Sequence, residues 1–150
     1  MWDKYRHSSP QTITVIGVLI LSSKLALADG AFTDVEREEI LRIVPHEIEQ
    51  RALLSKIINE AVADPHDIYF HARRLKKLLG DGREDFLEFI VAILVKVAHA
   101  DHIYDEEEDK QIRKVAEIFG IKPSLSDRTI RFFKNIPIYL NKINFKRSNA

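Results

Sequence analysis

The stretch KLALADGAFTDVEREEILRIV, from Lys24 to Val44, recurs later in the chain as KVAHADHIYDEEEDKQIRKVA, from Lys96 to Ala116. The two copies align without a gap and share six identical residues: a lysine, two alanines, an aspartate, a glutamate and an isoleucine. In each copy an apolar segment ends in Ala-Asp, a short turn follows, and an acidic segment then places apolar residues at helical spacing. This order predicts a duplicated helix–loop–helix with a pseudo-twofold relation between its copies.

Helix start and stop signals along the chain predict an all-α fold, a compact bundle of about seven helices. Ser9 followed by Pro10 predicts the first start, because serine caps helices and proline suits the first helical position. This helix, running to about Ala28, is apolar on nearly every side, which predicts a buried, central position. The other helices are expected over residues 33–44, 46–63 and 64–79, then from a capping box formed by Asp81 and Glu84, over 105–120, and from Ser124 onward. Residues 136–140 are expected to form an irregular segment that lies over the core.

The composition indicates one domain over residues 1–150, with its core at about 10–135 and a basic C-terminal tail at 136–150. A hydrophobic content of 45% supplies enough apolar side chains for one core. The chain has no cysteine, which excludes disulfides, cysteine-based zinc fingers and thiol catalysis. Acids and bases number 23 each, so no net charge favours nucleic acid as a partner. The basic tail is expected to be solvated, or to tether the chain to a partner or a membrane.

The N-terminal region imitates a secretory signal, with Lys4 and Arg6 preceding an apolar run from Ile13 to Leu21. The run is interrupted at Gly17 and is too short to span a bilayer. A modified copy of its final part recurs deep inside the chain, so we interpret it as a core helix. We therefore expect no transmembrane segment, and a location in the cytoplasm or at the inner face of the membrane.

Each repeat pairs an aspartate at the end of its first helix with a glutamate seven residues later. Glu36 lies four residues before Ile40 on the apolar stripe of its helix, and Glu108 has the same relation to Ile112. Both glutamates are therefore expected to face the core, where a carboxylate costs free energy unless it is paired or coordinated. The two loops together form a candidate divalent-cation site. Its candidate ligands are Asp29, Glu36, Asp101 and Glu108, with Asp34 and Asp105 as secondary candidates.

The same acids also have a purely structural interpretation. Residues 33–36 and 105–108 match the capping box, in which a glutamate side chain accepts a hydrogen bond from the backbone of the N-cap residue. Such a cap contributes about 1 kcal/mol and needs no ligand. Lys24 and Lys96 could in addition neutralise the acids in a network of ion pairs. The sequence leaves the metal site and this metal-free network both open.

The first loop matches half of a calcium-binding loop. Residues 30–36 fit the second half of an EF-hand loop, with a glycine at the sharp turn, an apolar residue two positions later and a glutamate at the end. The first and third loop positions require acids, but Leu25 and Leu27 occupy them, which excludes a complete EF-hand. A site that draws half of its oxygens from each repeat is still possible, and calcium is the cation we expect there.

The duplicated Ala-Asp turn, each followed by an apolar residue, a cap and a glutamate, and the closing segment VAEIFGI at 115–121 resemble the TerB-like tellurite-resistance family. The resemblance covers about Thr14 to Ile130. The same domain forms the N-terminal regulatory part of membrane-anchored DnaJ co-chaperones of the DjlA type. The resemblance implies a bacterial seven-helix bundle, an acidic cluster that binds a divalent metal, and a role in stress response. His102 replaces the glycine of the motif in the second copy, which puts metal affinity there in doubt.

The six histidines do not indicate catalysis. His66 and His71 are five residues apart, a spacing that does not place two side chains on one helical face. His99 and His102 lie beside Asp101 and could add nitrogen ligands for zinc. His7 and His46 are expected at the surface. The chain shows no nucleophile motif and no glycine-rich phosphate loop, so we do not expect an enzyme.

These observations predict a non-enzymatic, stress-linked domain that binds a divalent cation and mediates protein interactions. By resemblance, its partners would be membrane-associated stress proteins or chaperone machinery, and a homodimer is a further possibility. The alternatives are a metal-free interaction scaffold, a co-chaperone regulatory module, and a module that reaches the membrane through its basic tail.

Overall fold

The computed structural model describes residues 1–44, 46–99 and 106–121, and this part of the chain is all-α. Its helices are α1 (Pro10–Ala26), α2 (Asp34–Ile43), α3 (Arg51–Ala63), α4 (Ile68–Leu79), α5 (Glu84–His99) and α6 (Glu106–Phe119). Short 3-10 helices precede α1, follow it and precede α3: η1 (Asp3–Tyr5), η2 (Leu27–Asp29) and η3 (Ile48–Gln50). The all-α prediction is confirmed for the described residues. Outside them lie the helix expected from Ser124, the irregular segment expected at 136–140 and the basic tail.

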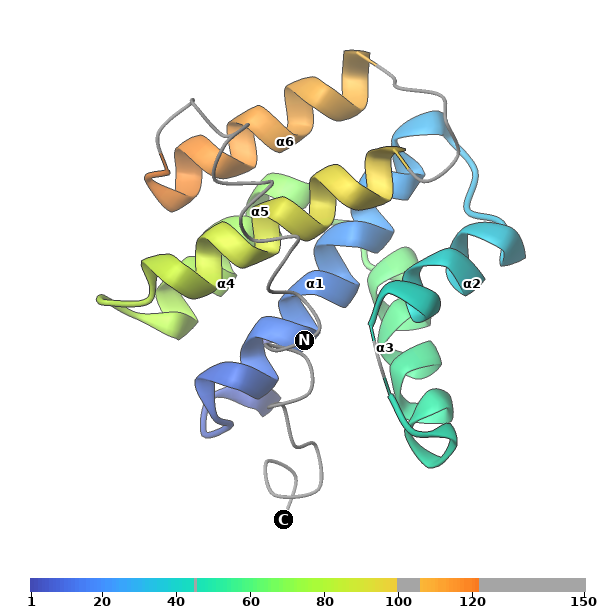
Figure 1. Cartoon of the computed structure of the whole chain (residues 1–150), viewed down its shortest axis with the longest axis horizontal. Coiled ribbons are helices and arrows are strands. Elements are labelled where there is room, and N and C mark those ends of the chain that lie inside the picture. Colours follow the sequence, from blue (N-terminus) through green and yellow to red (C-terminus); the bar gives the residue numbers. More distant parts are fainter. Residues whose placement is uncertain (45, 100–105, 122–150) are drawn as a thin grey trace.

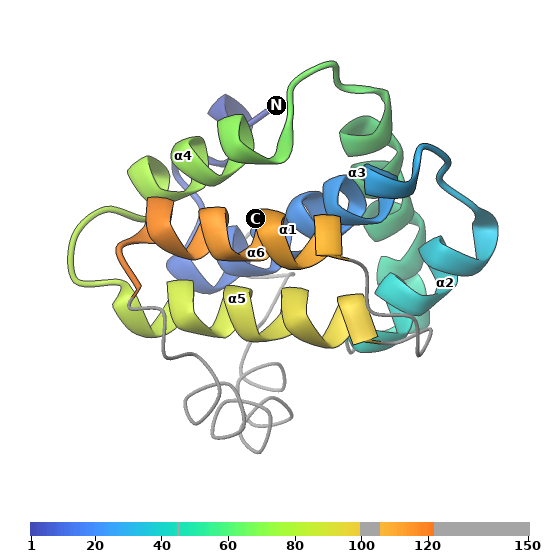
Figure 2. The same cartoon turned by 90° about the horizontal axis from the view of Figure 1, so that it is seen from above.

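Helix α1 runs through the middle of the bundle, with α3, α4 and α5 packed around it (Figures 1 and 2). Every residue from Thr12 to Leu25 is buried, as a helix that is apolar on all sides requires. The predicted cap is present, since the Ser9 hydroxyl accepts a hydrogen bond from the Thr12 amide at 3.2 Å. The prediction of a buried central helix is therefore confirmed. Within the described ranges, no helix is both long and apolar enough to cross a membrane.

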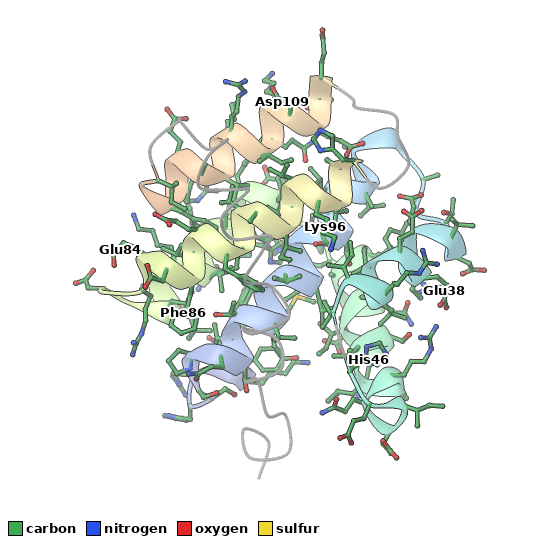
Figure 3. All side chains as sticks on the ribbon, viewed as in Figure 1. Glu38, His46, Glu84, Phe86, Lys96 and Asp109 are labelled. Atoms are coloured by element: carbon green, nitrogen blue, oxygen red, sulfur yellow. The ribbon has the colours of Figure 1, made fainter. Side chains whose placement is uncertain are left out.

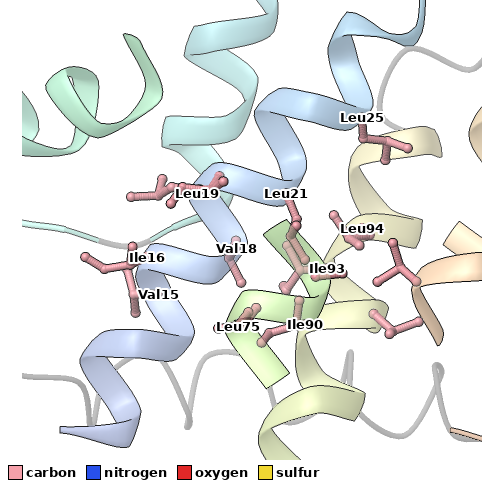
Figure 4. Packing of buried hydrophobic residues seen from close by; sticks show 14 of the residues in the cluster. Val15, Ile16, Val18, Leu19, Leu21, Leu25, Leu75, Ile90, Ile93 and Leu94 are labelled. Carbon is pink, nitrogen blue, oxygen red and sulfur yellow. The ribbon is translucent and has the colours of Figure 1, made fainter. Parts of the chain in front are cut away.

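Side chains from three helices interlock at the centre of the core (Figure 4). Leu19 and Leu21 of α1, Leu75 of α4 and Ile90 of α5 are all fully buried. Burial of each such side chain stabilises the fold by about 1.5–3 kcal/mol. Helix α6 packs against α4 and α5 and so covers the side of this core that α2 and α3 leave open.

Gly17 allows α1 and α4 to approach each other closely. A Cβ atom at this position would lie 2.6 Å from Cδ2 of Leu75, which is itself fully buried. Any side chain at position 17 would therefore displace Leu75 or push the two helices apart. The glycine that interrupts the apolar run in the sequence thus has a packing role.

Helix α4 begins later than the sequence predicted. We expected its start at Asp64-Pro65, but the first helical residue is Ile68. Asp67 caps the helix, and its carboxylate accepts a hydrogen bond from the Phe70 amide at 2.9 Å. Asp64 instead contacts side chains from other parts of the chain, as described below. Tertiary contacts therefore decide which of the two aspartates, Asp64 or Asp67, caps the helix.

Two other predicted helix starts are also wrong. The third helix was expected from His46, but α3 begins at Arg51, after the short helix η3. The capping box expected from Asp81 does not form, because α5 begins only at Glu84. Gly82 has φ +78°, outside the right-handed helical region, so a helix cannot continue from Asp81 through this residue.

The helices after the two repeat loops begin at equivalent positions. Thr33 caps α2, which starts at Asp34, and α6 starts at the equivalent residue Glu106. The predicted stop at Gly120 is confirmed, since this glycine follows the last residue of α6 and has φ +75°. Residues 100–105 lie outside the described part of the chain, so the pseudo-twofold relation of the loops stays a prediction.

Gly30 supplies the turn between η2 and the cap of α2. Its φ is +98°, and no atom lies within 4 Å of the position a Cβ would take, so only the backbone opposes a side chain. We expect Gly30→Val to lower the free energy of unfolding by about 1–2 kcal/mol. Ala31→Val, at the next exposed position, should change it by less than about 0.5 kcal/mol. Urea denaturation measures both variants, and equal losses would contradict this account of the turn.

Candidate functional site

The described segments next to the predicted acidic site lie on one side of the bundle. The C-terminal ends of α1 and α5 and the N-terminal end of α6 lie on this side, and the α1–α2 loop leaves from it (Figures 1 and 2). Glu36 and Glu108 are both the third residue of their helices, α2 and α6. The side chain of Asp29 and the whole of Asp101 and Asp105 lie outside the described residues. The structure therefore positions two of the four principal candidate ligands.

Glu36 forms the capping box that the sequence predicted. Its Oε1 accepts hydrogen bonds from the Thr33 amide at 3.2 Å and the Thr33 hydroxyl at 3.0 Å. The Thr33 hydroxyl in turn accepts one from the Glu36 amide at 3.2 Å. All contacts of the carboxylate use Oε1, so Oε2 has no hydrogen-bond partner in the described part of the chain. The structural interpretation is thus confirmed for the first loop, and it leaves one oxygen available to a cation.

The two glutamates differ in burial. Glu108 is only 8% exposed, as expected for a residue on the buried stripe that Ile112 and Val115 continue. Glu36 is only half-buried, because the buried side of α2 is centred between Ile40 and Leu41 and leaves Glu36 at its edge. The prediction that both carboxylates face the core is therefore right for Glu108 and wrong in degree for Glu36.

The secondary candidate Asp34 is directed to the surface. Its side chain is 96% exposed and pairs with Arg37 at 2.7 Å. His99, the described member of the histidine pair considered for zinc, places Nδ1 2.8 Å from the Val95 carbonyl, while His102 lies outside the described residues. Within residues 1–44, 46–99 and 106–121, no three histidine or carboxylate side chains are grouped so that they could hold a metal ion.

A buried polar network that the sequence analysis missed lies between α1, α3 and α4. Its centre is Asp64, the residue that follows α3. Oδ1 of Asp64 is 3.0 Å from Nε2 of His71 and accepts a hydrogen bond from the His66 amide at 2.8 Å. The Lys24 amine lies 3.9 Å from the same oxygen and donates to the Asp64 carbonyl at 2.5 Å. Lys24 was considered as a partner of the repeat acids, but the structure places its amine against Asp64.

The network extends to the N-terminal residues through Trp2. The indole Nε1 of Trp2 donates a hydrogen bond to Nδ1 of His71 at 2.9 Å. Since Nδ1 accepts, the imidazole proton must be on Nε2, which donates to Asp64. Both His71 bonds are thus satisfied by the neutral form of the ring, whose side chain is fully buried.

The charges of the network are shifted in ways that follow from burial and contact. Burial lowers the pKa of His71, against the opposing effect of the Asp64 hydrogen bond. Burial also lowers the pKa of Lys24, only partly offset by the charges of Asp64 and Asp67. For Asp64, burial acts to raise the pKa, but the hydrogen bonds from His66 and His71 outweigh it and leave the pKa below its usual value. The arrangement therefore holds an ionised carboxylate beside a neutral histidine.

The comparison with known families agrees with the resemblance seen in the sequence. A family model described as tellurite resistance protein TerB matches residues 15–130. The chain belongs to the TerB family. The match contains both repeat loops and all six described α-helices except the first five residues of α1. No curated protein and no solved structure matches the chain.

The predicted acidic site lies wholly within the residues matched to the TerB family, whereas the buried network extends beyond them. All candidate acids lie inside the matched region, from Asp29 to Glu108. Of the buried network, Lys24, Asp64 and His71 lie inside the TerB region, whereas Trp2 precedes it. The residue that donates a hydrogen bond to Nδ1 of His71 therefore lies outside the region matched to the TerB family.

Part of the missed network was visible in the sequence. His71 lies three residues after Ile68 and four before Leu75, on the buried stripe of α4, so its burial could have been predicted. Lys24 similarly lies in a helix that is apolar on all sides. The five-residue spacing of His66 and His71 was misleading, because His66 precedes the helix and turns back to Asp64. The pairing of Trp2 with His71, 69 positions away, has no local signal.

Proposed function

We propose that this TerB-family domain binds one divalent cation between its two repeat loops and acts as a non-enzymatic, tellurite-resistance-like stress domain. The ligands would be carboxylate oxygens, which suit calcium or magnesium better than softer metals. The principal ligands are Asp29, Glu36, Asp101 and Glu108, with Asp34 and Asp105 in a secondary role.

The observation that carries this proposal is the equivalent placement of Glu36 and Glu108 at the starts of α2 and α6. Glu36 uses only one carboxylate oxygen for its cap, and Glu108 lies buried at the start of α6, with 8% of its surface exposed. Two carboxylates about 4 Å apart repel by roughly 4 kcal/mol at an effective dielectric of 20. A bound cation would offset this repulsion if the acids of the two loops converge. When bound, it would supply positive charge that fixes the two loops relative to each other.

A metal-free interaction scaffold is the second candidate, and the Thr33–Glu36 capping box favours it. In that case the acids stabilise helix starts, and the domain serves stress proteins, chaperone machinery or a second copy of itself through its surface. We place this scaffold in the cytoplasm or at the inner face of the membrane, where the basic tail at 136–150 would attach it.

Calorimetric titration of the full chain with calcium, magnesium, manganese and zinc distinguishes the two candidates. We expect calcium to bind with the strongest signal and a stoichiometry of one. Combining Glu36→Gln with Glu108→Gln should abolish the signal, because each change removes a charged ligand while glutamine still supports a capping box. The matched control is Glu38→Gln, which removes an exposed charge on the outer side of α2 (Figure 3) and should leave binding unchanged. Absence of binding by all four metals would favour the scaffold.

A further inference from the structure

The first eight residues fold back over the bundle and form a strap, defined here as residues 1–8. Trp2 is 6% exposed and belongs to the hydrophobic core, while Tyr5 packs against that core. Lys4 adds an ion pair of 2.8 Å with Glu60 of α3. The polar end of Trp2 is held by His71 of α4 through the hydrogen bond of 2.9 Å. The strap is thus attached by apolar burial, by one ion pair and by one buried hydrogen bond.

That buried hydrogen bond is compatible with only one protonation state of His71. Nδ1 must carry a lone pair in order to accept the indole proton, because an indole can donate but not accept. Nε2 is already committed as the donor to Asp64. A second proton on the ring would have to go to Nδ1, where its N–H would point at the N–H of Trp2. Protonation of Nδ1 therefore replaces the hydrogen bond by a repulsive contact between two N–H groups.

The charges that surround His71 come from three elements. Helix α1 contributes Lys24, whose positive charge opposes protonation of the ring. The segment between α3 and α4 contributes Asp64, which favours protonation, and His66, which opposes it. The strap contributes the uncharged indole. Helix α6 also packs against α4, but its Glu107 acts on Tyr69, two residues before His71 and therefore almost on the opposite side of the helix.

We propose that the strap is a pH-released latch, in which a proton on Nδ1 of His71 removes the acceptor of Trp2 and lets residues 1–8 leave the bundle. Release would uncover the apolar site in the core that the indole fills. The latch rests on His71 and Trp2, neither of which is a candidate ligand of the cation site.

The direction of the pH effect follows from burial, which holds the pKa of His71 below its ordinary value of 6.5 while the strap is seated. Once the strap leaves, water reaches the ring and the pKa returns toward the ordinary value. The released form then binds more protons, so the seated form is favoured above pH 6.5 and loses ground as the pH falls below it. One linked proton changes the ratio of released to seated strap by at most about tenfold per pH unit.

Trp2 is the only tryptophan in the chain, so its fluorescence reports on the strap alone. The experiment measures quenching by acrylamide, rather than emission intensity, from pH 8 to pH 5, with helicity followed by circular dichroism. We expect the indole to be protected at pH 8, and the quenching constant to rise several-fold below pH 6.5 while helicity is retained. Coincident loss of protection and helicity would overturn the proposal, as would protection that persists to pH 5.

Two variants separate His71 from other titrating groups. His71→Gln replaces the ring by an amide that can accept from Trp2 and donate to Asp64 but does not titrate, so Trp2 should stay protected to pH 5. His66→Gln is the matched control, since His66 contacts the same Asp64 oxygen without touching Trp2, and the transition should remain. An unchanged transition in His71→Gln would overturn the proposal. If that variant does not fold, the wild-type comparison of quenching with helicity decides alone.

Discussion

Replacement of Asp64 by alanine should lower the free energy of unfolding by about 3 kcal/mol, the low end of the range for breaking a buried ion pair. The side chain of Asp64 is 18% exposed, whereas that of its partner Lys24 is only 6% exposed. The substitution removes the carboxylate nearest to the buried lysine amine, which keeps its hydrogen bond to the backbone carbonyl of residue 64, and it removes the acceptor of His71. For a domain of this size the melting temperature should fall by roughly 6–12 °C, at about 2–4 °C per kcal/mol.

The matched control for Asp64→Ala is Glu38→Ala. Glu38 also contacts a basic side chain, that of Arg51, but both groups are about half exposed and screened by water, so the loss of stability should be much smaller than in Asp64→Ala. Combining Asp64→Ala with Lys24→Met should recover part of the stability, because no uncompensated charge then stays buried. Chemical denaturation of the wild type, the two single variants and the double variant measures these losses and the recovery. Equal losses of stability in Asp64→Ala and Glu38→Ala would show that the buried network stabilises the fold no more than an exposed ion pair does.

Calcium at a hundredfold excess over its dissociation constant should raise the melting temperature by roughly 5–11 °C. A ligand that binds only the folded state at this excess adds about 2.7 kcal/mol to the free energy of unfolding. For a domain of this size each kcal/mol corresponds to roughly 2–4 °C. Differential scanning fluorimetry across a calcium series measures the shift, and magnesium should give a smaller one.

The double substitution Glu36→Gln with Glu108→Gln provides the test of residue identity. It should abolish the calcium-dependent shift and leave the melting temperature of the metal-free protein nearly unchanged, since glutamine also serves a capping box. The scaffold interpretation expects no shift in the native protein. A native protein whose melting curve does not respond to calcium, magnesium, manganese or zinc would decide for the scaffold.

Features set by neighbouring residues could be predicted from the sequence. The Ser9 and Thr33 caps, the burial of α1 and the helix stop at Gly120 all depend on patterns within a few positions. The burial of Glu108 followed in the same way from its spacing to Ile112. These predictions are right because local hydrogen bonding and helical periodicity favour the same structure as the tertiary packing.

Features that depend on contacts between distant segments could not be predicted. Asp64 and Asp67 are both good helix caps in the sequence, and only the arrival of Lys24 and His71 at Asp64 leaves Asp67 to cap α4. Glu36 is less buried than predicted because the packing of α2 turns its buried side toward Leu41. The Trp2–His71 bond joins residues 69 positions apart. Packing decides each of these, and a spacing rule contains no information about it.

The central claim is that one cation joins both repeat loops, and paramagnetic broadening by manganese tests it most directly. Manganese accepts the oxygen ligands that calcium prefers, and its broadening of amide NMR signals falls steeply with distance. At a substoichiometric amount of manganese, signals of residues 29–36 and 101–108 should broaden together, and an excess of calcium should restore them. Glu36→Gln should weaken the broadening in both loops, because they share the ion. Broadening confined to one loop, or none in either, would contradict the shared site.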